Sequence, residues 1–375
     1  MIEQSARITG LGISRIGRRL GIDPWVLTAD ACLAAIADAG LTPDDIDGLA
    51  TYPGAFWSTP GITGAGVDDV RAMLGIRTRW HTGGGELPGQ LGSVINAVLA
   101  VAGGLASHVL CFRTVWESTA QTRIGSRAAT LKQAPPREHT QWLDPYGGGY
   151  STYGALQMQR YMHESGATRE QLGQIAVTAR AHAALNPLAA YREPLTLEDY
   201  LGARMIADPL CLFDCDVPID GSVAFVVSRA DEGRIDLSRA IAFEAIGSAA
   251  GFAESAAMLW SRTALKPGDV HLAELYDGFS ILAITWMEAL GLVPPLAAGR
   301  FIEGGEAISR GGPLPLNTGG GQLSGGRLHG YGQLYQACRQ LRGEAGAMQL
   351  PAQPEVAIVS SGASSFTSCL LLSRR

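Results

Sequence analysis

Two glycine-rich segments in the second half of the chain carry the residues with the clearest chemical potential. Tyr276 stands in the sequence Tyr-Asp-Gly-Phe, and Arg327, His329 and Tyr331 follow the glycines at 319–321. Phenols and imidazoles can transfer protons in a dry pocket, and a guanidinium can hold a carbonyl oxygen or a carboxylate. These residue types predict acid–base chemistry. The structural alternatives are that Tyr276 is a packed tyrosine and that His329 packs the loop.

The six cysteines form no recognisable disulfide or metal pattern. They are scattered through apolar runs. Cys211 and Cys215 are the only close pair, and no second pair or nearby histidine completes a tetrahedral zinc site. We interpret all of them as core thiols, including Cys111, and we expect no metal.

Length and composition favour a large globular protein. At 375 residues, with 46% hydrophobic and 17% charged residues, the chain suits two fused α/β units with much buried surface. The net charge of −6 gives no reason to expect nucleic acid. Because no signal peptide or run of about 18 apolar residues is present, we expect a cytoplasmic protein.

The chain contains an internal duplication. A helical pattern, a proline-containing turn and a buried strand occur in both halves, and the matching residues are Leu41, Pro43, Asp45 and Ile46 in the first copy and Leu265, Pro267, Asp269 and Val270 in the second. Each copy continues with a glycine-rich loop, a helix and a short strand, at 89–102 and 108–111 and again at 330–341 and 356–360. Alternating strands and helices predict mostly parallel sheets. We divide the chain into halves at 1–230 and 231–375.

Residues 114–210 do not repeat. They include two expected helices, at 155–164 and 169–184, the second with Thr168 as its N-cap candidate. An insertion of this size is usually functional, so we expect a lid or a binding domain within the first half.

Several motifs resemble those of a known family. The segment at 317–330 and the matching segment at 81–90 resemble the active-site loops of the thiolase superfamily, and 208–228 resembles the strand that closes its N-terminal half. The Tyr-Asp-Gly-Phe motif at 276–279 is similar to the Tyr-Asp-x-Phe of the lipid-transfer-protein group, which includes bacterial steroid side-chain aldolases. The resemblance implies an α/β fold of two duplicated halves in a five-layered αβαβα sandwich, with an inserted loop domain.

The resemblance also implies a change of chemistry. The nucleophile position of thiolases corresponds to about Leu87, and no cysteine lies nearby. A retro-aldol cleavage of a β-hydroxyacyl-CoA needs no such nucleophile, and in the aldolases a pair of tyrosines does the work. Tyr276 matches the first. The second aligns with Arg327, and Tyr331 follows four residues later, on the same face if a helix runs through both. Either Tyr331 supplies the phenol, or Arg327 holds a carbonyl or carboxylate instead.

The remaining expectations also follow from the resemblance. Coenzyme A enters as part of the substrate, without a covalently bound cofactor, and arginines of the insertion contact its phosphates. A homodimer would form through the first-half sheets around 109–112, and a small OB-fold, zinc-ribbon partner would complete the site. The alternative function is a non-catalytic or condensing subunit that binds acyl-CoA. The expected loop residues are Gly84, Gly85, Asn317, Gly320, Gly321 and Gly362, and the arginines are Arg127, Arg160 and Arg180.

Overall fold

The computed structural model describes residues 1–54, 61–84, 88–124, 149–233, 235–364 and 366–374. Within them, nine strands form a mixed sheet in the order β3-β2-β4-β7-β1-β8-β11-β10-β9. The strands are β1 (Ala6–Ile13), β2 (Gly48–Thr51), β3 (Trp80–Gly83), β4 (His108–Trp116), β7 (Asp220–Arg229), β8 (Ile241–Ala249), β9 (Leu272–Glu274), β10 (Val356–Ala363) and β11 (Phe366–Ser373). The halves join where Arg7 and Ile8 of β1 pair with Ala242 and Ile241 of β8.

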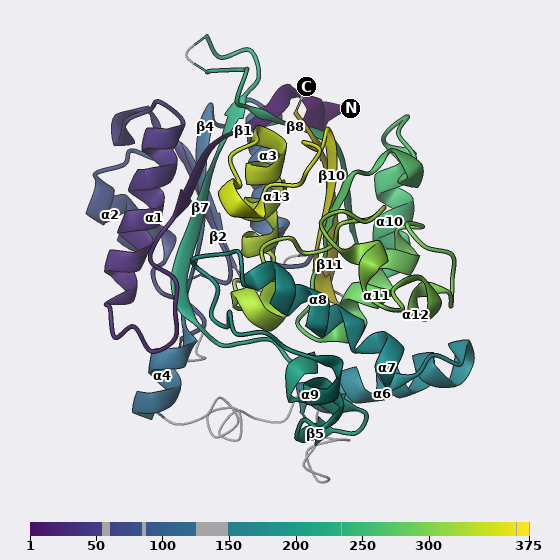
Figure 1. Ribbon diagram of the computed structural model, residues 1–375. Helices are drawn as coiled ribbons and strands as arrows, with labels where there is room; N and C mark the ends of the chain where they lie inside the picture. Colours follow the sequence, from purple (N-terminus) through teal and green to yellow (C-terminus); the bar gives the residue numbers. More distant parts are fainter. Residues whose placement is uncertain (55–60, 85–87, 125–148, 234, 365, 375) are drawn as a thin grey trace.

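The helices make this sheet into five layers (Figure 1). Helices lie between the two halves of the sheet and cover the outside of each half. They are α3 (Gly92–Ala102) and α13 (Tyr331–Arg342) in the centre, α1 (Pro24–Asp38) and α2 (Val67–Leu74) on one side, and α10 (Phe252–Ser261), α11 (Ser280–Ala289) and α12 (Ala298–Phe301) on the other. The predicted αβαβα sandwich is confirmed.

The repeated motif has the same local structure in both halves. Pro43 and Pro267 open the 3₁₀ turns η2 (Pro43–Asp45) and η5 (Pro267–Asp269). The carboxylate that ends each turn accepts the backbone N–H of the residue before the proline. Asp45 accepts from Thr42 at 2.9 Å, and Asp269 accepts from Lys266 at 2.7 Å. The chain then enters β2 or β9. The repeated sequence therefore corresponds to a capped 3₁₀ turn that precedes the first parallel strand of each half.

The insertion lies across one end of the sandwich, at the bottom of Figure 1. The expected helix at 169–184 is broken at Gly173, where a Cβ would meet the ring of Tyr200 at 2.5 Å. Thr168 caps the first piece, as predicted, by accepting the N–H of Gln171. The described elements are α4 (Glu117–Ile124), α6 (Tyr150–Ser165), α7 (Arg169–Leu172), α8 (Gln174–Ala183), α9 (Leu197–Leu201), β5 (Met205–Ala207) and β6 (Leu210–Cys211).

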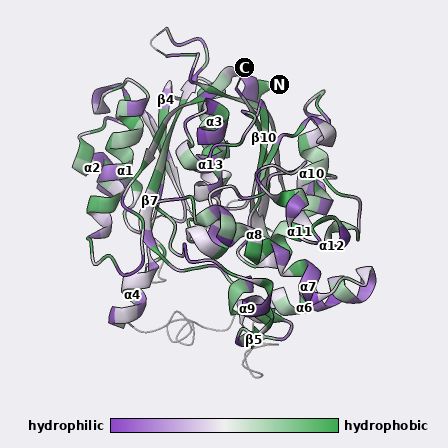
Figure 2. Ribbon diagram, in the orientation of Figure 1, coloured by the Kyte–Doolittle hydropathy of each residue, from purple (hydrophilic) through white to green (hydrophobic). Residues whose placement is uncertain are grey.

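Burial follows the layers. Figure 2 shows both hydrophobic and hydrophilic residues on the outer helices α1, α2 and α12, as expected for helices that face a sheet on one side and solvent on the other. Five cysteines are buried and Cys215 is partly buried, which agrees with core thiols. None of the helices in the described part of the chain is long and apolar enough to cross a membrane.

The strand order changes the expected dimer surface. β4 lies between β2 and β7, so residues 109–112 are interior and cannot form an edge. β3 is the first-half strand at the sheet edge. The predicted homodimer stays a prediction, and edge pairing would use β3. The predicted division at 230/231 falls between β7 and β8 and also stays a prediction.

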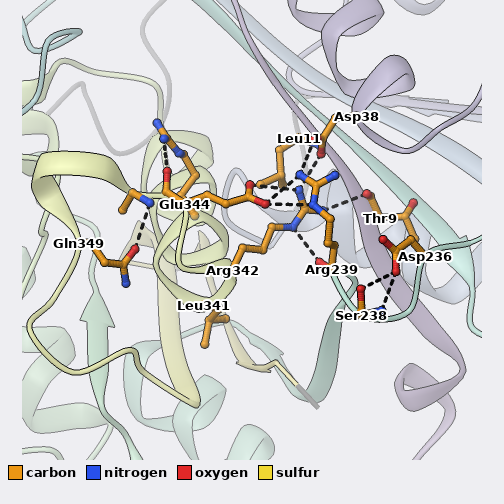
Figure 3. A network of polar contacts seen from close by, with 12 residues as sticks. Thr9, Leu11, Asp38, Asp236, Ser238, Arg239, Leu341, Arg342, Glu344 and Gln349 are labelled. Atoms are coloured by element: carbon orange, nitrogen blue, oxygen red, sulfur yellow. Dashed lines mark hydrogen bonds and ion pairs between the residues drawn. The ribbon is translucent and has the colours of Figure 1, made fainter.

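An ion-pair network ties the two halves together at the end of α13 (Figure 3). Arg342 of α13 donates to Asp38 at the end of α1 at 2.7 Å and to the carbonyl of Thr9 in β1 at 2.9 Å. Arg239, just before β8, donates to the other oxygen of Asp38 at 2.9 Å. Asp38 also accepts the N–H of Leu11 at 2.9 Å. One carboxylate thus links the first half to two arginines of the second.

Replacing Asp38 with Asn should destabilise the protein, because the side chain of Arg342 is 1% exposed and would lose its carboxylate partner. Removing one member of a buried ion pair costs about 3–5 kcal/mol, and the partial exposure of Asp38 favours the lower end. Denaturant unfolding followed by circular dichroism measures the free energy. The control is Asp231→Asn, whose pair with Arg229 is exposed and should leave the free energy of unfolding nearly unchanged.

The effect of Asp38→Asn on the free energy of unfolding should depend on pH. Burial opposes ionisation of Asp38, but hydrogen bonds and the charge of Arg342 outweigh it and lower its pKa below the ordinary 3.8. This contribution is complete above the unfolded-state pKa and is lost as pH falls through the folded-state pKa. The stability gap between the wild type and Asp38→Asn should therefore narrow below about pH 4. A gap equally wide down to the acid transition would contradict this explanation.

Candidate active site

The candidate site lies where parallel strands end. β2 runs parallel to β3 and β4, and β9 runs parallel to β10. Ligands of parallel sheets bind beyond the carboxyl ends of the strands. Tyr52 comes directly after β2 and Glu117 directly after β4. Tyr276 is the second residue after β9. The insertion covers this end of the molecule (Figure 1).

Tyr276 is a buried phenol held from both sides. Its backbone N–H donates to Ser360 of β10 at 3.0 Å, and Gln90 donates its side-chain N–H to the Tyr276 hydroxyl at 3.3 Å. A Cβ at Gly278 would meet the Tyr276 ring at 2.9 Å, so the glycine of the motif lets the ring fold back. Burial raises the pKa of Tyr276, the Asp216 charge adds to this, and the Arg327 charge opposes it. At neutral pH the hydroxyl therefore keeps its proton.

Asp277 fixes the glycine-rich loop beside Tyr276. Its carboxylate accepts the N–H of Gln322 at 2.9 and 3.0 Å and the side-chain N–H of Gln333 at 2.9 Å. Burial raises the pKa of Asp277 to about 7. A Cβ at Gly321 would lie 2.0 Å from the Asp277 carboxylate, and this residue has a φ of +54°. Close packing therefore accounts for the glycine at 321.

The predicted loop residues occupy different environments. Asn317 pins the strand end by accepting the N–H of Leu275 at 2.7 Å and donating to its carbonyl at 2.9 Å. The Gly320 N–H is used inside the turn, where it donates to Asn317. Gly362 has a φ of +86°, and a Cβ there would collide with the carbonyl of Phe366. Gly84 has open space on its Cβ side. Gly85 lies outside the described residues, and the oxyanion roles stay predictions.

Arg327 is clamped by two carboxylates. It donates to Glu117, the first residue of α4, and to Asp216 at 2.8 Å. Burial would lower its pKa, but Asp216 and Glu117 raise it overall, so the guanidinium stays charged. The expectation that Arg327 and Tyr331 lie one helical turn apart is wrong. α13 begins only at Tyr331, and Gly326, His329 and Gly330 all have positive φ angles, which break the helical path.

Tyr331 points into the central layer. Its side chain is fully buried, its hydroxyl shares a 2.6 Å hydrogen bond with Ser93 of α3, and its ring packs 5.4 Å from Phe225 of β7. Burial raises its pKa, with a smaller contribution from Cys111. The Tyr331 hydroxyl therefore bridges the two central helices. Its predicted catalytic role is not tested by these contacts.

His329 joins the Arg327 cluster to the loop beside Tyr276. Its backbone N–H donates to the side-chain oxygen of Gln322 at 2.9 Å, and the backbone N–H of Gln322 donates to Asp277. Arg113 Nη2 lies 2.9 Å from His329 Nδ1. Because an arginine only donates, Nδ1 must accept, and the neutral ring carries its proton on Nε2. That nitrogen lies 3.9 Å from Glu117.

The predicted coenzyme A arginines are dispersed. Arg160 pairs with Glu164 at 2.6 Å on the exposed face of α6. Arg180 is buried, donates to Ser324 of the glycine-rich loop at 2.8 Å and stacks on Tyr191. Arg180 therefore fastens the insertion to the site loop. Arg127 lies outside the described residues, and all three phosphate contacts stay predictions.

Sequence reasoning missed Glu117, Asp216, Gln90 and Arg113. Glu117 had a usable signal, since an acidic residue directly after a buried parallel strand stands at the ligand-binding edge. Arg113 interrupts an apolar run, and it is fully buried in β4. Asp216 had no local signal. Within the described residues, no group of three or more His, Cys, Asp or Glu is arranged to hold a metal ion.

Comparisons with known proteins agree with this geometry. Residues 239–374 match the thiolase C-terminal domain-like family. A steroid side-chain-cleaving aldolase of Thermomonospora curvata is 34% identical over 98% of this chain and 97% of its own length. A 17-hydroxy-3-oxo-4-pregnene-20-carboxyl-CoA lyase of Mycobacterium tuberculosis is also 34% identical, over 99% of this chain and 100% of its own. This chain belongs to the thiolase superfamily, in the lipid-transfer group of the steroid aldolases.

A solved structure supports the same placement. The Ltp2–ChsH2(DUF35) aldolase matches with a TM-score of 0.87 and 32% identity over 99% of this chain and 98% of the other. An acetyl-CoA acetyltransferase from Syntrophomonas wolfei shares the fold with a TM-score of 0.67 at 16% identity over 98% of each chain. The superfamily fold is thus shared at low sequence identity.

The buried position of Tyr331 predicts a structural effect. In Tyr331→Phe the ring still packs on Phe225, but Ser93 loses its partner, which should cost about 1 kcal/mol of unfolding free energy. Turnover should stay close to that of the wild type. Unfolding curves and steady-state rates of the same preparation measure both, and a stable variant without activity would instead make Tyr331 the second phenol.

Proposed function

We propose that this protein is a carbon–carbon lyase that cleaves a β-hydroxyacyl-CoA by a retro-aldol reaction. The observation that carries the proposal is the buried phenol of Tyr276 at the end of β9, in a site without a cysteine nucleophile. Cys111 is fully buried in β4, where burial raises its pKa and disfavours a thiolate. A thiolase mechanism requires a thiolate, whereas a retro-aldol step requires proton transfer.

Tyr276 suits the final step of such a cleavage. When the bond between the α and β carbons breaks, the acyl-CoA fragment leaves as an enolate that needs a proton at its α carbon. A phenol with a raised pKa still carries its proton at neutral pH and can deliver it there. The hydrogen bond from Gln90 orients the hydroxyl and stabilises the phenolate that follows.

The relatives' names support a steroid thioester as the substrate. A suitable probe is 17-hydroxy-3-oxo-4-pregnene-20-carboxyl-CoA, which the Mycobacterium tuberculosis relative is named for. Its hydroxyl lies on the carbon β to the thioester. Retro-aldol cleavage would therefore give a 17-ketone and propanoyl-CoA. We further propose that coenzyme A lies under the insertion, which covers the strand ends.

Tyr276→Phe tests this function with little change in packing. Removing the proton donor should lower kcat by about 10²–10⁴-fold, while thermal unfolding changes little. Cys111→Ala is the control and should keep the chemistry, because its thiol is part of the core. The measurement is release of propanoyl-CoA from the steroid thioester. An active Tyr276→Phe beside a folded but inactive Cys111→Ala would indicate thiolate chemistry instead.

We also propose that the protein works with a small partner of the OB-fold, zinc-ribbon type. The support is the Ltp2–ChsH2(DUF35) aldolase, whose name joins two components and whose structure matches this chain over nearly its full length. Adding a co-encoded DUF35 protein should raise turnover and form a complex detectable by size-exclusion chromatography with light scattering. Full turnover by the isolated chain, unchanged by such a protein, would contradict the proposal. The homodimer and the cytoplasmic location stay predictions.

A further inference from the structure

The cluster around Arg327 contains buried polar atoms that the described residues leave unsatisfied. Glu117 Oε1, Arg327 Nε and Arg113 Nε are buried, and none has a hydrogen-bond partner within the described chain. Folded proteins rarely bury such atoms without a partner. Finding two unpaired donors and one unpaired acceptor in a single cluster indicates a place where a ligand supplies the missing contacts.

Glu117 is the acceptor of this set. It begins α4 directly after β4, and its side chain is 3% exposed. Arg327 holds Oε2, while Oε1 faces His329 Nε2 at 3.9 Å. Nε2 carries the proton of the neutral ring, because Nδ1 accepts from Arg113. One hydroxyl oxygen could therefore lie within hydrogen-bond distance of both groups, donating to Glu117 and accepting from His329.

The neighbouring carboxylates are engaged elsewhere. Asp277 accepts the N–H of Gln322 on both of its oxygens. Glu274 accepts both the N–H and the hydroxyl of Thr318 on its Oε1, and burial raises its pKa to about 8, which favours its neutral form at neutral pH. Asp216 accepts from Arg327 and balances part of the charge of the guanidinium. Glu117 is the carboxylate of the Arg327 cluster whose buried oxygen has no hydrogen-bond partner among the described residues.

We propose that Glu117 is the base that takes the proton from the β-hydroxyl of the substrate, with Arg327 and His329 as its positioning residues. This inference rests on the proposed lyase function and deepens it. Arg327 fixes the carboxylate through Oε2, and His329 Nε2–H directs a lone pair of the hydroxyl so that its proton faces Oε1. Tyr276 is left to act at the α carbon.

The step balances without any further reactant. The proton of the β-hydroxyl moves to Glu117 Oε1, and the O–H electron pair becomes the new carbonyl bond. The electrons of the α–β carbon bond pass into the thioester enolate, which takes a proton from the Tyr276 hydroxyl at the α carbon. The proton on Glu117 then returns to the Tyr276 phenolate through solvent, and both residues are restored.

Glu117→Gln separates this role from that of Tyr276. It keeps an oxygen that can accept from Arg327, but it removes the base. Cleavage of the steroid thioester should fall by about 10²–10⁴-fold in kcat with KM little changed. Exchange of the α hydrogens of propanoyl-CoA with deuterated water needs the Tyr276 phenolate as its base, because burial raises the pKa of this phenol. The exchange is therefore followed by mass spectrometry in alkaline buffer, where part of Tyr276 ionises without Glu117. It should persist in Glu117→Gln and disappear in Tyr276→Phe.

The matched control is Glu3→Gln, which alters another buried glutamate paired with an arginine, Arg262 at 2.7 Å. Glu3 lies beside the N-terminus, at the opposite end of the molecule from α4 (Figure 1). This control should cleave like the wild type. Glu117→Asp keeps the charge opposite Arg327 and so preserves the fold. It withdraws the carboxylate by about 1 Å, a displacement that can cost about 10²-fold in rate.

Each outcome decides the assignment. Undiminished cleavage by a folded Glu117→Gln or Glu117→Asp protein overturns the assignment. It is also overturned if Glu117→Gln loses both cleavage and α-hydrogen exchange. If the wild type itself, with its partner present, cleaves no β-hydroxyacyl-CoA, the proposed lyase function fails first. A cleaving wild type with unaffected Glu117 variants leaves the lyase function standing and removes only the base.

Discussion

The whole site depends on one constraint, which is that the parallel strands of both halves end on the same side of the sandwich. The groups that follow β2, β4 and β9 must therefore share a buried space, where water is not available to satisfy them. Each polar group has to find a protein partner or a ligand. Gln322 meets this demand by donating its backbone N–H to Asp277 while its side chain accepts from His329. The glycine-rich loop is thus held by the same contacts that prepare the site.

Two ionic networks in the described part of the chain differ in how many of their polar atoms are hydrogen-bonded. At the end of α13, both oxygens of Asp38 are bonded, to Arg239 on one side and to Arg342 and the Leu11 N–H on the other. That network joins the halves and leaves its carboxylate fully used. In the Arg327 cluster, a buried oxygen of Glu117 and the Nε of Arg327 lack partners among the described residues. A network in which every polar atom is bonded stabilises the fold, whereas buried polar atoms without a partner among the described residues are atoms that a ligand could bond, as proposed above.

The sequence predicted what is local and missed what depends on tertiary pairing. Pro43 and Pro267 begin equivalent turns because the capping carboxylate lies only two residues further on, so the repeat was visible as a motif. Tyr276 was predicted because its motif resembles one of the family, and the burial of its side chain agrees with that prediction. Asp216 lies in the segment that leads into β7. Because β7 pairs with β4, this segment lies beside α4 and Asp216 contacts Arg327. No spacing along the chain encodes that contact. Arg327 and Tyr331 do not lie on one helix, because Gly326, His329 and Gly330 have positive φ angles. The residue types gave no warning at His329, where a left-handed conformation is uncommon.

The proposed mechanism divides the proton transfers between two kinds of acid, with Arg327 at the position where the resemblance leads us to expect a second phenol. Carboxyl groups ordinarily ionise near pH 4 and phenols near pH 10, so a carboxylate base is ready at neutral pH, while a buried phenol is ready to donate. Burial shifts Tyr276 further in the donating direction. A site with two buried phenols would first have to remove a proton from one of them. A site with one phenol and one carboxylate starts the cycle in its reactive protonation state, provided that a cation offsets the buried negative charge. Arg327 supplies that cation at the position where a second phenol would stand, and its clamp on Glu117 and Asp216 follows from this exchange.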